Sequence, residues 1–162
     1  MRIRRVEIER FRGIKELEWN IDGDFVCLIG PGDATKTTIL DAIELALSPR
    51  WNIQFDDTDF YATDTSKPIV IRVTVGDLPD DLKSDAKYGL EARGWSPDGE
   101  LHDEPEYNDE VVLTIQLRVE PSLEQSWTVV NNRNPEGKPI SAKDREKLGC
   151  VRLGDYLDRH FS

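Results

Sequence analysis

Residues 25–38 read FVCLIGPGDATKTT and constrain the fold more than any other stretch of the chain. A short apolar run stops at Gly30, a turn with a second glycine follows, and Lys36-Thr37-Thr38 opens an amphipathic segment. Backbone N–H groups in such a turn converge on phosphate oxygens, and the positive end of the following helix favours the same charge. We therefore predict a strand, a phosphate-binding P-loop and a helix from about Lys36 to Leu47.

The residue types in this stretch indicate binding of ATP with Mg²⁺. The Lys36 amine is placed to reach the β- and γ-phosphates, and the Thr37 hydroxyl to ligate Mg²⁺. Thr35 departs from the pattern G-x-x-x-x-G-K-[ST], which has glycine at that position. A β-carbon there would crowd the phosphate or strain the loop, at a cost of about 1–3 kcal/mol. We expect weakened nucleotide binding; the alternative is an ordinary turn with a solvated lysine.

The bulk composition predicts a single cytoplasmic domain. The chain has 162 residues and two cysteines, Cys27 and Cys150, which we interpret as reduced thiols rather than a disulfide framework. No apolar run approaches the roughly 18 residues of a membrane span, and no signal-peptide core follows Met1. We therefore expect no contact with a membrane.

The charge is concentrated in the middle of the chain. Sixteen acidic and five basic residues lie between Trp51 and Glu110, a balance of −11 that equals the net charge of the whole chain. A nucleic-acid-binding surface needs basic residues to neutralise phosphates, so this segment argues against nucleic-acid binding by the chain alone. We interpret residues 51–110 as a solvated acidic loop, with a cation site or a basic partner as the alternative.

Hydrophobic periodicity predicts an α/β fold in which the P-loop helix packs against a mixed sheet. An antiparallel β subdomain is expected from the N-terminal hairpin and the strands after Ile69. We divide the domain into residues 1–50 (hairpin, P-loop and helix), 51–110 (loop-rich, one strand) and 111–162 (antiparallel strands and C-terminal helices). The expected elements are a hairpin over 1–21, a turn at Asp22-Gly23, strands at Phe25–Ile29, Ile69–Val75, Val111–Val119 and Trp127–Asn131, a helix capped by Ser141, and a helix over 153–161.

Other metal chemistry finds little support in the sequence. His102 and His160 are isolated, and neither has metal-ligand spacing from Cys27 or Cys150. Four aspartates of the acidic segment form a denser group, for which a divalent-ion site is the alternative to the simpler interpretation of solvated carboxylates: Asp56, Asp57, Asp59 and Asp64.

The N-terminal motifs resemble those of a known ATPase group. A basic strand ends in Phe11-Arg12-Gly13-Ile14, and the P-loop follows it and leads into Thr38-Ile39-Leu40-Asp41-Ala42-Ile43. The chain is similar to the N-terminal lobe of ABC-type ATPases of the RecF and structural-maintenance-of-chromosomes (SMC) group. Within that group it most resembles the overcoming-lysogenisation-defect (OLD) family of ATP-dependent endonucleases, also through Asp59-Phe60-Tyr61 and the closing segment 154–160.

The resemblance implies a role for each matching position. Lys36 matches the P-loop lysine, Thr37 the magnesium-ligating hydroxyl, and Arg12 an arginine that lies beside the nucleotide phosphates; a solvated hairpin arginine is the alternative for Arg12. The complete set of implied nucleotide-binding residues is Arg12, Gly30, Gly32, Asp33, Ala34, Thr35, Lys36, Thr37 and Thr38. The implied cofactors are ATP and Mg²⁺.

Several motifs of the same group are absent from the sequence. It has no Leu-Ser-Gly-Gly signature, no apolar run ending in Asp-Glu as a Walker B motif, and no room for the carboxylate cluster of a TOPRIM nuclease domain. The resemblance therefore implies an ATP-binding segment of an OLD-like endonuclease, in DNA repair or phage defence, that is inactive alone. It further implies a homodimer or larger assembly of the complete protein, with nucleic-acid contacts made by parts absent here.

Three alternatives use other classes of function. The first is a degenerate nucleotide-sensing or regulatory module that binds a full-length ATPase partner, which Thr35 and the missing Walker B motif favour. The second is a small GTPase, which requires Asp-x-x-Gly and Asn-Lys-x-Asp, and neither string occurs. A small-molecule kinase is a further alternative, but the chain has no arginine-rich lid.

Overall fold

The structure is a computed structural model that describes residues 1–21, 33–50 and 52–148. Several predicted features lie outside the described residues: the turn at Asp22-Gly23, the strand at 25–29, Gly30, Gly32, the helix at 153–161, both cysteines and His160. The strands are β1 (Arg2–Phe11), β2 (Ile14–Asn20), β3 (Ile69–Gly76), β4 (Arg93–Trp95), β5 (Leu101–His102), β6 (Glu110–Val119), β7 (Gln125–Val130) and β8 (Lys138–Pro139). The helices are α1 (Asp33–Leu47) and α2 (Ala142–Lys147), with 3₁₀ turns η2 (Asp57–Asp59), η3 (Tyr61–Thr63), η4 (Asp80–Lys83) and η5 (Gly89–Glu91).

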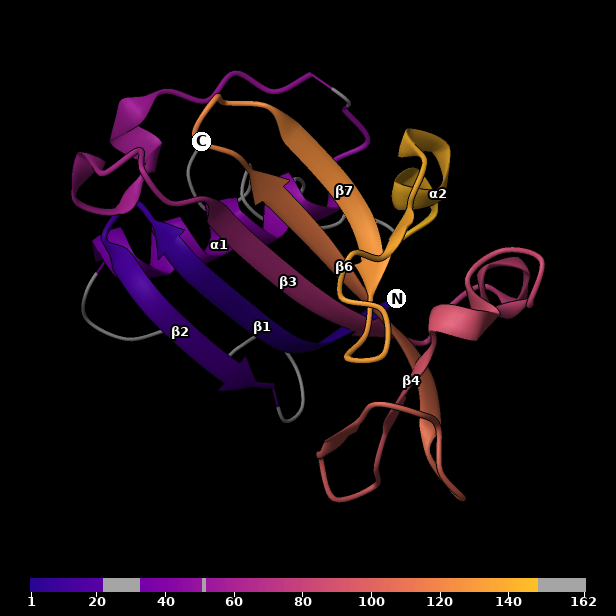
Figure 1. The fold of residues 1–162 in the computed structure, drawn as a ribbon. Helices are drawn as coiled ribbons and strands as arrows, with labels where there is room; N and C mark the ends of the chain where they lie inside the picture. The colour runs from indigo at the N-terminus through magenta and orange to yellow at the C-terminus, as the bar shows by residue number, and fades with distance from the viewer. Residues whose placement is uncertain (22–32, 51, 149–162) are drawn as a thin grey trace, which may run out of the picture.

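The strands form one curved sheet in the order β2-β1-β3-β6-β4-β5, with β7 paired to β6 and β8 to β7 (Figure 1). Each strand pair among the described residues is antiparallel. The expected antiparallel subdomain is therefore confirmed. Parallel pairing, which the expected mixed sheet requires, is not seen among the described residues, and the predicted strand 25–29 lies outside them.

One face of the sheet is apolar because the strand registers align hydrophobic residues in rows. Ile8 pairs with Ile71, Ile71 with Leu117, and Leu117 with Trp127, so one row crosses four strands. The row beside it consists of Val6, Val73, Ile115 and Val129, all fully buried. Each strand alternates, so the opposite face has the polar row Glu7, Arg72, Gln116 and Thr128.

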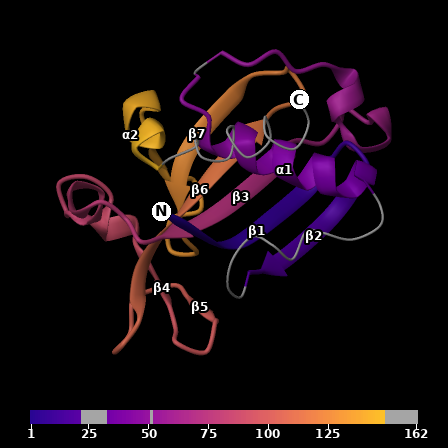
Figure 2. The ribbon, with the colours of Figure 1, turned by 180° about the vertical axis from the view of Figure 1, so that it is seen from behind.

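Helix α1 lies across the apolar face of the sheet, as Figure 2 shows from behind. Its buried residues recur at helical spacing: Ile39, Ala42, Ile43, Ala46 and Leu47. The indole Nε1 of Trp127 donates to the Leu45 carbonyl at 3.2 Å, which joins the end of α1 to β7. Ser48 and Pro49 follow the helix, and the predicted stop is confirmed.

The sequence prediction missed β4 and β5, which extend with the beginning of β6 as a separate arm (Figures 1 and 2). These strands have only three and two residues, and glycine and proline surround them, so no alternation reveals them. The arm is joined to the sheet by buried Arg93. Its guanidinium donates to Thr114 on β6 at 3.1 Å, to Asp103 at 3.2 Å and to Asn132 at 2.9 Å.

The two-residue strand β8 was not predicted either, whereas the hairpin, the β6–β7 pair and α2 agree with the sequence. The hairpin joins β1 and β2 with Phe11 opposite Ile14, and β6 pairs antiparallel with β7 as predicted. The Ser141 hydroxyl accepts from the Asp144 N–H and caps α2, as expected. No helix in the described part of the chain is both long and apolar enough to cross a membrane.

Candidate functional site

The first turn of α1 carries the described part of the P-loop sequence. The helix begins at Asp33, three residues before the predicted start at Lys36. Lys36 is half-buried and Thr37 is exposed, so both side chains are accessible at this end of the helix. The first N–H groups of a helix lack intrahelical acceptors, and the helix dipole adds partial positive charge there. These features fit the phosphate and Mg²⁺ roles predicted for Lys36 and Thr37.

The backbone at Thr35 corrects one part of the sequence argument. Thr35 lies within α1 and is helical, a conformation that any L-residue adopts. A glycine-only backbone is therefore not required at this position, and the strain expected there has no basis. Steric crowding of a phosphate by the Thr35 side chain stays a prediction.

Arg12 occupies an unusual backbone position beside this helix. It lies in the two-residue turn between β1 and β2 with φ of 51°, in the left-handed region that favours glycine, although the glycine of the turn is the next residue, Gly13. The Arg12 N–H donates to the Asp59 carbonyl at 2.8 Å, and the guanidinium stacks on the Phe11 ring at 4.6 Å. These contacts hold a strained conformation, which is typical of functional positions.

The Arg12 guanidinium joins three parts of the chain. Its Nη1 lies 2.5 Å from Asp41 Oδ2 on α1, and its Nε lies 3.1 Å from Asp59 Oδ1 in η2. Burial opposes the charge, but the hydrogen bonds from Arg12 to the two carboxylates and their charges outweigh it and raise the pKa of Arg12. Asp41 is one helical turn beyond Thr37. A solvated hairpin arginine is therefore the wrong interpretation, whereas contact with a nucleotide stays a prediction.

The segment after α1 is held against the same turn. Phe60 is only 1% exposed and forms a backbone bridge with Phe11. Arg10 donates to Asp64 at 3.0 Å and lies over the Tyr61 ring at 5.6 Å. Asp59-Phe60-Tyr61 is therefore fastened to the end of β1 through a backbone bond, a buried ring and ion pairs.

These contacts correct the interpretation of the acidic segment as a solvated loop. Asp59 and Asp64 pair with Arg12 and Arg10, while Asp56 accepts from the Thr58 N–H at 2.8 Å and caps η2. The hydrogen bonds from Thr58, followed by weaker contributions that include Arg12, lower the pKa of Asp56. Among the described residues, these aspartates form no group with metal-binding geometry; the one such group is elsewhere.

That group consists of His102, Glu106 and Asp109, whose ligand atoms all lie within 4.8 Å of one another. The sequence prediction of an isolated His102 is therefore wrong. The sequence signal of this group is the spacing His-x₃-Glu-x₂-Asp within one loop, which involves no cysteine.

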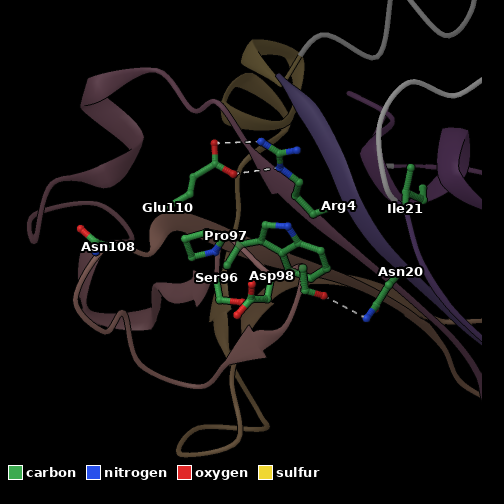
Figure 3. Close-up of a pocket in the computed structure, with 10 residues that line it drawn as sticks. Arg4, Asn20, Ile21, Ser96, Pro97, Asp98, Asn108 and Glu110 are labelled. Carbon is green, nitrogen blue, oxygen red and sulfur yellow. Dashed lines mark hydrogen bonds and ion pairs between the residues drawn. The ribbon is translucent and has the colours of Figure 1, made fainter.

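A cavity of 530 Å³ lies at the other end of β1 (Figure 3). Arg4 lines it but is neutralised by Glu110, with Nε–Oε1 at 2.8 Å and Nη2–Oε2 at 3.3 Å. Asn20 donates to the Gly99 carbonyl at 3.3 Å across the cavity. Eight residues of extended strand separate Arg4 from Arg12, or about 26 Å, so the cavity is distinct from the Arg12 site.

Comparisons with known proteins agree with this architecture. A family model described as "AAA ATPase domain" matches residues 1–148. No curated protein sequence matches the chain significantly.

Similar folds occur among solved structures, where 23 chains match significantly. One of them comes from a study of ATP-driven dimerization and DNA-stimulated activation of SMC ATPases. It has a TM-score of 0.56 and 14% sequence identity, and the match covers 99% of this chain and 91% of that one. At this identity the similarity shows a shared fold, that of an SMC ATPase chain.

Proposed function

Because the chain belongs to the AAA ATPase domain family, we propose that it binds ATP with Mg²⁺ at the first turn of α1. In this proposal Lys36 contacts the β- and γ-phosphates and the Thr37 hydroxyl ligates Mg²⁺. The backbone before and at the start of α1 forms the phosphate cradle, from Gly30, Gly32, Asp33, Ala34, Thr35 and Thr38 together with the lysine and threonine.

The observation that carries the proposal is the fixed position of Arg12. A strained backbone, a stacked Phe11 ring and two carboxylates hold its guanidinium against α1, one turn beyond Thr37. A cation shared between Asp41 and Asp59 has an alternative partner when a triphosphate binds nearby, since guanidinium groups bind phosphate and carboxylate with similar geometry. We infer that Arg12 exchanges a carboxylate for a phosphate oxygen on binding.

For the complete protein, we propose an OLD-like ATP-dependent endonuclease, of DNA repair or phage defence, with this chain as its N-terminal ATP-binding segment. Support comes from the family match and from the contact of Asp59-Phe60-Tyr61, a segment that contributes to the resemblance, with the turn that carries Arg12. The similar SMC ATPase chain belongs to a study of ATP-driven dimerization. We propose by analogy that ATP brings two copies of the complete protein together.

We further propose that the isolated chain does not hydrolyse ATP. The apolar strand β6 ends at Val119 and is followed by Glu120-Pro121, and Glu120 is the nearest match to a Walker B carboxylate. Glu120 instead lies in the turn between β6 and β7, where it pairs with Arg118 at 2.5 Å. ATP hydrolysis in this class needs a carboxylate that positions water, and a second subunit to stabilise the transferred charge.

A nucleotide-sensing or regulatory module without catalysis is the second candidate. The same position of Glu120 favours it, because a carboxylate that lies in the turn after β6 and pairs with Arg118 is not placed to position water. The two candidates share ATP binding and differ in whether a partner restores turnover.

The decisive experiment is calorimetric titration with a non-hydrolysable ATP analogue, with and without Mg²⁺. We expect Mg²⁺-dependent binding that Lys36→Ala weakens by at least about tenfold, or 1.4 kcal/mol. Lys143→Ala, an exposed lysine in the first turn of α2, is the matched control and leaves the affinity unchanged. Binding that does not respond to Lys36→Ala would rule out the P-loop assignment.

Two further variants refine the site. Thr35→Gly tightens binding by less than about tenfold, because only side-chain crowding is relieved and the helix loses stability. Arg12→Ala weakens binding, and Arg12→Lys restores it in part. Phosphate release and plasmid nicking by the isolated chain stay at background; turnover that disappears with Lys36→Ala would contradict the proposed inactivity.

A further inference from the structure

The loop between β5 and β6 brings a histidine and two carboxylates to one point. His102 ends β5, and Glu106 and Asp109 follow within seven residues. His102 Nδ1 lies 2.8 Å from Asp109 Oδ2 and 2.9 Å from Glu106 Oε2. Both carboxylates therefore face the same ring nitrogen, which donates at most one hydrogen.

Asp109 is the buried member of this group. Its side chain is 1% exposed, and its second oxygen, Oδ1, is buried without a hydrogen-bond partner. A buried carboxylate oxygen without a donor is costly unless a cation compensates it. Asp109 is therefore the strongest indication that a ligand is missing from the group.

The strand beneath the loop makes room for this carboxylate. A β-carbon built on Gly94 of β4 would lie 2.2 Å from Asp109 Oδ2 and 2.8 Å from the Pro105 α-carbon. Only glycine lets the loop approach this closely. Asn108 has φ of 68°, a left-handed conformation that asparagine tolerates well, and it turns the chain just before Asp109.

The other side of the imidazole also faces a carboxylate. Glu100 Oε2 lies 3.9 Å from His102 Nε2. Metal-binding histidines commonly direct their second nitrogen to a carboxylate, which orients the ring and fixes its tautomer. With the proton on Nε2, the Nδ1 lone pair is directed toward Glu106 and Asp109, and all three groups are then electron donors.

We propose that His102, Glu106 and Asp109 bind a divalent transition-metal ion such as Zn²⁺ or Mn²⁺. One imidazole nitrogen and two carboxylates suit these ions, whereas Ca²⁺ and Mg²⁺ prefer oxygen ligands alone. The ion neutralises the two carboxylates, satisfies Asp109 Oδ1 and ties the end of β5 to the residues that begin β6. The site is independent of the proposed nucleotide site, which is on another part of the fold.

The test is calorimetric titration of the full chain with Zn²⁺ and Mn²⁺, without nucleotide and under reducing conditions. We expect one equivalent of micromolar binding with at least one of the two ions, and much weaker binding of Ca²⁺ and Mg²⁺. His102→Ala and Asp109→Asn each lower the affinity by at least about tenfold, the smallest effect typical of groups that support a metal site.

Two matched controls separate this site from others. His160→Ala removes the only other histidine of the chain, and Glu104→Gln removes a neighbouring exposed carboxylate that pairs with Arg133 at 3.0 Å. Both leave the affinity unchanged. Co²⁺ substitution provides a spectroscopic readout, since visible absorption bands respond to ligand replacement in the single variants.

Gly94→Ala tests the geometry without removing a ligand. The added methyl group displaces the Asp109 carboxylate, so metal affinity falls while circular dichroism at saturating ion shows a folded chain. The proposal is overturned if neither Zn²⁺ nor Mn²⁺ binds the wild type at micromolar concentration. Protonated His102 would then be the cation that pairs with Glu106 and Asp109. Binding that survives both His102→Ala and Asp109→Asn would overturn it equally.

Discussion

Two acidic stretches of the chain, residues 56–64 and 100–110, look alike in composition but meet different partners. The first meets Arg10 and Arg12, which the end of β1 brings to Asp64 and Asp59. In the second, Asp103 and Glu110 pair with arginines, whereas Glu106 and Asp109 meet only His102. Asp59 and Asp64 of the first stretch are neutralised by arginines, whereas the second keeps two carboxylates for which we propose a metal ion.

The difference shows that acidic composition alone does not determine which carboxylates pair with cationic side chains. Arg10 and Arg12 reach the first stretch because β1 ends there, and Phe60 anchors it to Phe11. The second stretch belongs to an arm that extends from the sheet (Figure 1). Arg4, Arg93 and Arg133 pair there with Glu110, Asp103 and Glu104, so the partner of Glu106 and Asp109 is His102. Position in the fold, rather than sequence, determines which carboxylates have counter-ions.

The largest effect that we predict concerns the anchor of the first stretch. Phe60→Ala removes a fully buried ring and lowers the free energy of unfolding by about 3–5 kcal/mol. Urea denaturation followed by tryptophan fluorescence measures the loss. Tyr107→Ala in the second stretch is the aromatic control, since Tyr107 is 93% exposed and its removal changes stability by less than about 0.5 kcal/mol. Equal effects of the two substitutions would contradict the comparison.

A smaller effect is expected from the ion pair. Asp59→Asn weakens the Arg12 contact and the cap on the Asp56 N–H, and we expect a loss of about 1 kcal/mol because Arg12 is partly exposed. Asp57→Asn, an exposed neighbour in the same turn, is the matched control. In an Arg12→Ala background the Asp59→Asn loss shrinks; an undiminished loss would show that Arg12 does not contribute.

The pH dependence of stability tests the role of Asp144, a carboxylate outside the two acidic stretches. Asp144 lies on α2 and contacts Lys87 and Tyr88, which lie between the two stretches in the sequence. Burial opposes its ionisation, but contacts with Tyr88 at 2.6 Å and Lys87 at 3.5 Å, together with a side-chain hydrogen bond from Ser141, lower the pKa of Asp144. Lys147 is also near, at 3.7 Å. Burial and the hydrogen bond to Asp144 raise the pKa of Tyr88 to about 12, so Tyr88 donates at neutral pH.

A lowered pKa stabilises the fold above the unfolded pKa of about 3.9, and this contribution is lost as the pH falls through the folded value. Asp144→Asn is therefore less stable than wild type at pH 7, by up to about 1 kcal/mol, and the gap closes below about pH 4. Urea midpoints between pH 7 and pH 3 measure the gap. A stability difference between wild type and Asp144→Asn that widens in acid would contradict the lowered pKa of Asp144.

The smallest expected effect is on DNA. Four of the five arginines in residues 2–12 pair with carboxylates: Arg4 with Glu110, Arg5 with Glu7 and Glu18, Arg10 with Asp64, and Arg12 with Asp41 and Asp59. Little positive charge is left for a phosphate backbone. A mobility-shift titration at physiological salt therefore shows no binding in the micromolar range. A salt-sensitive shift that is lost on neutralising Arg4 and Arg5 would contradict this.

Local patterns of the sequence determined much of the fold. Alternating residues predicted the hairpin and the strands β3, β6 and β7, and helical spacing predicted α1, because one face of each element must be apolar. Short-range chemistry likewise predicted the Ser141 cap. The motif in residues 25–38 indicated an ATPase, in agreement with the family match.

Only the tertiary structure decided which distant side chains meet. Arg12 lies 29 residues from Asp41 and 47 from Asp59, so no sequence pattern specifies its partners. The short strands β4 and β5 form because β6 offers them an edge, and Gly94 lets Asp109 approach. Contacts of this kind depend on strand pairing and chain reversal over long separations, whereas periodicity records only which face of each element is buried.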